Sequence, residues 1–169
     1  MAELSPLRRA KRPRSILAGP YGHPFHALFI TIPIGSWIAS IVFDVISLVA
    51  EEPAAFVVGA RWLVGIGIVG ALLAAFFGFL DLSILAKGTN ARRMALAHMT
   101  LNLVAVVVFT ASFFVRVAAP DDEASIAAFV ISIVGLLLVG ASGFLGGELS
   151  YRLGVRVADE GTQLEKGFS

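Results

Sequence analysis

Four long apolar stretches without a single Asp, Glu, Lys or Arg dominate this sequence, at residues 27–43, 62–80, 94–115 and 124–147. A helix needs about 20 apolar residues to cross the hydrocarbon core of a bilayer. The last three stretches have that length, and the first acquires it when the helix continues past Asp44 to Ala50. Only 15% of the residues are charged and the mean hydropathy is +0.87, whereas about a quarter of a soluble domain is charged. The sequence therefore predicts an all-α integral membrane protein, a bundle of four transmembrane helices.

Basic residues gather on one side of the predicted bundle. They precede the first stretch, connect the second to the third and follow the fourth, while Arg61 and Arg116 are the only two on the other side. Loops rich in Lys and Arg stay in the cytoplasm. Both termini are therefore expected to be cytoplasmic, in a multi-pass protein of the bacterial inner membrane.

The expected organisation has three parts. A basic cytoplasmic arm is expected over residues 1–20, a transmembrane domain over 21–151 and a cytoplasmic tail over 152–169. Pro33 is expected to kink the first helix, and no internal repeat is evident. The transmembrane helices are expected at about 24–50, 58–86, 92–118 and 123–149.

The chain contains no cysteine. This excludes disulfides, thiolate-bound zinc, iron–sulfur clusters and covalently attached c-type haem, because each needs sulfur from the chain. A cofactor would have to be held by His, carboxylate, Asn or backbone groups. The lipid bilayer is the expected partner, and no nucleic acid partner is expected.

Ionisable residues at membrane depth usually face the interior of a bundle and mark functional sites. Five of them, contributed by all four helices, are expected at the cytoplasmic ends of the helices. Asn102 follows one of them by four residues and shares its helical face. This layer is the expected functional site, and its members are His23, His26, Asp81, His98 and Glu148.

Asp44 lies outside this layer. It follows His26 by about 27 Å of helix, at 1.5 Å per residue, which places it at the opposite leaflet. The basic residues on that side are Arg61 and Arg116. We expect Asp44 to form a structural ion pair with one of them.

Several motifs resemble those of one bacterial membrane family. They are Gly-His-Pro-Phe-His at 22–26, Pro-Ile-Gly at 33–35, Gly-Phe-Leu-Asp at 78–81, His98 with Asn102, and the segment 146–155. Together they resemble the uncharacterised family catalogued as domain of unknown function 2231, over about residues 20–157. The resemblance implies the same architecture. Some members of that family carry a fused Rieske-type iron–sulfur domain, which implies electron transfer near the cytoplasmic face and, for this chain, a separate redox protein or membrane complex as partner.

The first functional hypothesis is a cofactor site, because imidazole binds iron, copper and zinc and a carboxylate can orient the ring. His26 and His98 are the expected axial pair for a b-type haem, with His23 as a further candidate. The depth of His26, in the first turn of its helix, is shallow for a macrocycle. A divalent metal ion needs less room, and its expected ligands are His23, His26, His98, Asp81 and Glu148.

Two other hypotheses stay open. In the first, the protein is a membrane scaffold or accessory subunit, and the polar layer is structural because buried polar groups must find partners. In the second, the same layer provides general acid–base catalysis on a lipid or quinone. The sequence identifies no catalytic residue, and it leaves the substrate open, as well as whether the chain forms a homo-oligomer.

Overall fold

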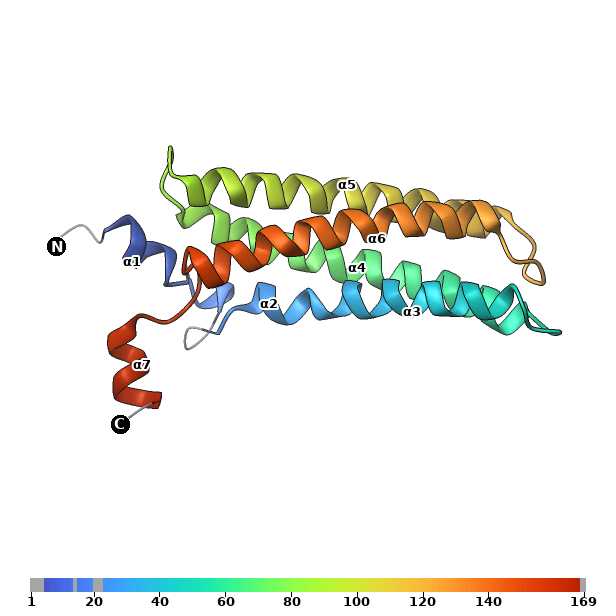
Figure 1. Ribbon diagram of the computed structural model, residues 1–169, viewed down its shortest axis with the longest axis horizontal. Helices are drawn as coiled ribbons and strands as arrows, with labels where there is room; N and C mark the ends of the chain where they lie inside the picture. The colour runs from blue at the N-terminus through green and yellow to red at the C-terminus, as the bar shows by residue number, and fades with distance from the viewer. Residues whose placement is uncertain (1–4, 14, 20–22, 168–169) are drawn as a thin grey trace.

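The computed structural model describes residues 5–13, 15–19 and 23–167. Within these ranges the helix is the only regular secondary structure, which confirms the predicted fold class. Four spans are long and apolar enough to cross a membrane, and they run side by side in one bundle (Figure 1). These spans are Phe25–Ser47, Ala54–Ile84, Asn90–Ala118 and Ile126–Arg152.

The first span is interrupted. It consists of α2 (Phe25–Phe29) and α3 (Thr31–Ser47), with Ile30 between them. Pro33 explains the interruption, because its ring clashes with the carbonyl of Phe29 four residues earlier and it has no N–H to donate. Because of this break, His26 lies on a short separate helix, α2.

The other spans begin at residues that suit helix starts. Pro53 is the N-cap of α4 (Ala54–Ile84), so this helix begins earlier than position 58. The hydroxyl groups of Thr89 and Ser125 cap α5 (Asn90–Ala118) and α6 (Ile126–Gly147), each accepting a backbone N–H at 3.3 Å. A π-helical segment, Glu148–Arg152, extends α6.

Each long helix packs against two neighbours. α3 contacts α4 and α6, and α5 contacts the same two helices, so α3 and α5 lie diagonally opposite in the bundle. The α4–α5 contact is more extensive than the α3–α6 contact. Helices α1 (Pro6–Ala10) and α7 (Glu160–Gly167) lie at one end of the bundle, which we call the termini end, and the opposite end is the far end (Figure 1).

The diagonal between the first span and α5 is bridged at three levels. At the middle level, Trp37 stacks on Phe109 with ring centroids 3.9 Å apart and an interplanar angle of 7°. From the termini end to the far end, the three residue pairs are His26 with His98, Trp37 with Phe109, and Asp44 with Arg116. In each pair the second residue follows the first by 72 positions in the sequence.

Helices α4 and α6 also make corresponding contacts with the paired rings. Gly67 on α4 contacts Trp37, and Gly135 on α6 contacts Phe109. Two α-hairpins, 25–84 and 90–152, thus make corresponding contacts at corresponding positions. No repeat is evident in the sequence, because some of the paired positions, such as Asp44 and Arg116, share depth and packing but not residue type.

The N-terminal arm and the tail pack on the termini end of the bundle. The arm contains α1 (Pro6–Ala10) and a 3-10 turn at Ile16–Ala18, and the tail contains α7 (Glu160–Gly167). The backbone N–H of Arg156 donates to Ala10 O at 3.0 Å, which joins the two segments. An apolar cluster buries the same contact and comprises Ala10, Leu82, Leu85, Leu149 and Val155.

Candidate functional site

Two histidines from diagonally opposite helices face one another near the termini end. His26 is on α2 and His98 is on α5. Their ring centroids lie 6.1 Å apart, with an interplanar angle of 83°. These two members of the predicted polar layer are therefore brought together by the fold, at equivalent positions of the two hairpins.

Each imidazole is held by a backbone carbonyl of the helix that follows it in its own hairpin. His26 Nδ1 lies 2.8 Å from Ala74 O on α4, and His98 Nδ1 lies 2.8 Å from Ser142 O on α6. A carbonyl oxygen only accepts hydrogen bonds, so Nδ1 carries the proton in each neutral ring. Nε2 then carries the electron pair on both rings.

Glycines allow the rings to approach these carbonyls. Gly78 and Gly146 each follow the accepting residue by one helical turn. A Cβ atom at Gly78 would lie 3.0 Å from His26 Nδ1, and one at Gly146 would lie 3.2 Å from His98 Cε1. Both distances are too short for a comfortable contact, so a larger residue at either position would displace a histidine ring.

The two histidines differ in one respect. Asn102, which was expected on the face of His98, places Nδ2 3.1 Å from His98 Nε2 and 3.1 Å from His98 O. The hydroxyl group of Ser142 also donates to His98 O, at 3.1 Å. The ring of His98 is therefore positioned by polar groups from α5 and α6.

A cavity of about 380 Å³ lies between the helices at this level. Both histidines and Asn102 line it, and most of its other walls are apolar, including Trp37 toward the middle of the bundle. Asp81 and Arg156 are the charged residues among its walls. The site is thus an apolar chamber with few polar groups, a form typical of small-molecule and cofactor sites.

Asp81 and Arg156 form an ion pair at the cavity, with Arg156 Nε 3.2 Å from Asp81 Oδ1. The side chains are only 11% and 7% exposed. Arg156 Nη2 also donates to the carbonyl oxygens of Ala18 and His23, at 3.3 and 3.4 Å. Sequence reasoning placed Arg156 in the tail and gave it no role, because no spacing rule shows that the tail folds back on the bundle.

The two remaining members of the predicted layer lie elsewhere. His23 is exposed, and Glu148 pairs with Arg152 at 3.2 Å on the last turn of the fourth span. Neither lines the cavity. Over residues 5–13, 15–19 and 23–167, no three His, Asp or Glu side chains are close enough together to hold a metal ion.

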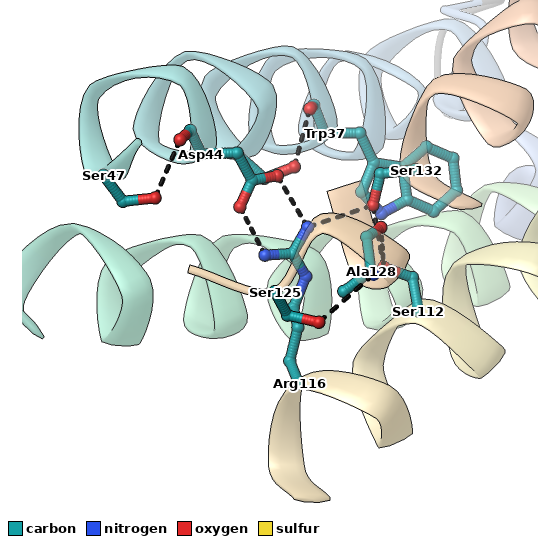
Figure 2. Close-up of polar contacts among 9 residues, drawn as sticks. Trp37, Asp44, Ser47, Ser112, Arg116, Ser125, Ala128 and Ser132 are labelled. Carbon is teal, nitrogen blue, oxygen red and sulfur yellow. Dashed lines mark hydrogen bonds and ion pairs between the residues drawn. The ribbon is translucent and has the colours of Figure 1, made fainter. Parts of the chain in front are cut away.

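A second polar cluster occupies the far end of the bundle (Figure 2). Asp44 accepts two hydrogen bonds from the Arg116 guanidinium, at 2.5 and 2.6 Å, and both side chains are buried. Arg116 also donates to Ser132 at 3.2 Å. Of the two arginines considered for Asp44, Arg116 is the partner, whereas Arg61 pairs with the exposed Asp121.

Comparison with known proteins agrees with the resemblance seen in the motifs. A family model described as predicted membrane protein (DUF2231) matches residues 22–159. No curated protein matches the chain, and no solved structure does. The match covers both hairpins, the two histidines and Arg156. The chain therefore belongs to the DUF2231 family of membrane proteins, embedded in the lipid bilayer by four helices.

Proposed function

We propose that this protein binds b-type haem between His26 and His98 and transfers electrons in the membrane. The separation of the two rings carries the proposal. A metal atom about 2 Å from each of two imidazole nitrogens places the ring centres roughly 6 Å apart, and the observed separation is 6.1 Å. Paired histidines on facing helices are a common way for a four-helix bundle to hold haem.

The hydrogen bonds of the rings support the same assignment. Histidines that bind metals usually donate their other N–H to a carbonyl or carboxylate, which fixes the tautomer and the ring orientation. Here Ala74 O and Ser142 O accept from the Nδ1 atoms and leave the Nε2 atoms for iron. Asn102 would release His98 Nε2 when iron binds and keep its second hydrogen bond, to His98 O.

The apolar walls of the cavity suit the face of a macrocycle and keep water away from it. Bound haem would supply one-electron chemistry, with a potential tuned by burial and by the hydrogen bonds of its ligands. Since the chain has no cysteine for a second redox centre, the electron donor or acceptor would be a separate redox protein or membrane complex. We place the site at the cytoplasmic leaflet of the bacterial inner membrane, because most Lys and Arg residues lie at the termini end.

The alternative is a scaffold or accessory subunit in which the same groups are structural. One observation favours it: each ring already has a hydrogen-bond partner without any ligand, as Ala74 O and Ser142 O show. Polar groups that satisfy one another can tie helices together within a membrane. The two functions differ in whether the purified protein holds a chromophore.

An absorption spectrum of the purified protein, oxidised and reduced, tests the proposal. The protein should be expressed with iron and a haem precursor, and haemin should be titrated into the product. We expect a Soret band that shifts on reduction and that His26→Ala or His98→Ala removes. His23→Ala is the matched control and should keep the band. A wild-type protein without a Soret band, before and after titration with haemin, would support the scaffold function.

A further inference from the structure

Arg156 is a buried cation with an unused donor. Its side chain is 7% exposed, and it lines the cavity that contains both histidines. Nε faces Asp81, and Nη2 donates to two backbone carbonyls. Nη1 is buried and has no hydrogen-bond partner among the described residues, and the same holds for Nε, which has only its ion-pair contact with Asp81. Buried donors are nearly always satisfied, so an orphaned guanidinium N–H indicates a missing acceptor.

The surrounding chain holds this guanidinium in place. The backbone of Arg156 has a φ of +62°, a conformation that non-glycine residues rarely adopt. Its N–H is bonded to Ala10 O in the N-terminal arm. Gly19 packs so closely that an added Cβ would lie 2.9 Å from Nη2. The arm and the tail together therefore fix the side chain at the cavity.

The polarity of the cavity agrees with an amphiphilic ligand. Its walls toward the middle of the bundle are apolar and include Trp37, Val106 and Val139, whereas its charged groups are Asp81 and Arg156. Haem has the same polarity, with an apolar ring and two propionate groups on one edge. Arginine binds carboxylates through charge-assisted hydrogen bonds and holds them better than lysine does.

We infer that Arg156 binds a propionate of the cofactor, which orients the propionate edge toward the termini end. This inference rests on the proposed haem function. Asp81 would balance the charge of Arg156 while the cavity is empty, and Nη1 would gain its acceptor when the cofactor binds. Arg156 is then a positioning residue that selects a porphyrin with free carboxylates.

Chemically modified porphyrins test this inference. Detergent-solubilised apo-protein is titrated with haem, with haem dimethyl ester, whose propionates are blocked, and with iron-free protoporphyrin IX and its dimethyl ester. We expect wild-type protein to bind each free acid at least ten-fold more tightly than its ester. In Arg156→Gln this preference should fall to less than three-fold. Arg152→Gln is the matched control, since Arg152 is exposed and pairs with Glu148 on its own helical segment, and it should keep the preference.

The outcomes separate the two claims. The proposed function, and the inference with it, would be overturned if wild-type protein did not bind haem. Haem binding that does not depend on His26 or His98 would overturn both as well. Binding of haem to the two histidines without a preference for the free acid would overturn the inference alone, as would a preference that survives in Arg156→Gln. If Arg156→Gln does not fold, the absence of a preference in wild-type protein would still overturn the inference, and Arg156→Lys should retain only part of the preference.

Discussion

Asp44 and Arg116 neutralise one another at equivalent positions of the two hairpins. They follow His26 and His98 along their respective helices at the same interval, and they face each other across the same diagonal. Corresponding positions thus hold a carboxylate and a guanidinium, and the two buried charges form one bidentate pair. This pair lies at the far end of the bundle, whereas the two histidines line the cavity near the termini end.

Removal of one partner of this pair should destabilise the protein strongly. Asp44→Asn leaves the Arg116 guanidinium buried without a counter-charge, which costs about 3–5 kcal/mol in buried pairs. Thermal unfolding of the detergent-solubilised protein, followed by circular dichroism, would show the loss as a large fall in Tm. The exchange Asp44→Arg with Arg116→Asp should recover part of it, because it restores the pair.

Arg61→Ala provides the control for this experiment. Arg61 pairs with Asp121, whose side chain is 64% exposed, and exposed pairs contribute about 0–1 kcal/mol. The fall in Tm should therefore be small. Equal losses in Asp44→Asn and Arg61→Ala would contradict the role that we give to burial.

The sequence predicted the features that the bilayer itself enforces. A bilayer of fixed thickness requires long uncharged helices. All four helices were located from their apolar stretches. The convergence of His26 and His98 was also predictable, because both lie near the same ends of their helices and polar side chains turn toward the bundle interior. The same reasoning paired Asp44 with an arginine of the far side, but it could not choose between two candidates.

The remaining features depend on tertiary contacts that no pattern in the sequence reports. The hydrogen bonds to Ala74 O and Ser142 O involve backbone atoms of neighbouring helices, which any residue could provide. The role of Arg156 arises only because the tail folds back onto the N-terminal arm. The repeat was hidden because only some equivalent positions keep their residue type, whereas others differ, as Trp37 and Phe109 do.

The orientation of the bundle can be tested with reporter fusions. We expect a periplasmic signal from fusions at Glu52 and Asp122, in the connections at the far end, and a cytoplasmic signal at Gly88, between α4 and α5. The distribution of Lys and Arg is the physical reason. A cytoplasmic signal at either of the first two positions would contradict the expected topology.

The middle of the bundle should depend on Trp37. Its ring is buried and stacks on Phe109, and its Nε1–H donates to Val64 O at 3.3 Å. Trp37→Ala would leave a void at the cavity, and we expect a loss of about 3 kcal/mol in unfolding free energy. Trp62→Ala is the control, because Trp62 is 68% exposed and exposed positions usually change stability by about 0.5 kcal/mol or less. Thermal unfolding of the two variants side by side measures the difference.

Substitution of the glycines beneath the histidines should impair haem binding without unfolding the bundle. In Gly78→Ala the new Cβ would lie 3.0 Å from His26 Nδ1, which is too close. We expect the ring to shift from its hydrogen bond with Ala74 O, and Nε2 to change its orientation. Since the ligand geometry would be lost, we expect at least a ten-fold weaker affinity for haemin in a spectroscopic titration. Gly146→Ala should act on His98 in the same way, but less strongly because its contact is 3.2 Å.

Gly140→Ala separates this effect from a general change in the helices. Gly140 is on α6, as Gly146 is, but an added Cβ there meets nothing within 4 Å. Alanine also favours helix over glycine, so this variant should bind haemin as wild type does and be no less stable. A loss of affinity in Gly140→Ala as large as in Gly78→Ala would mean that the glycines act through helix packing in general. Loss confined to Gly78 and Gly146 would link the affinity to the two histidine rings.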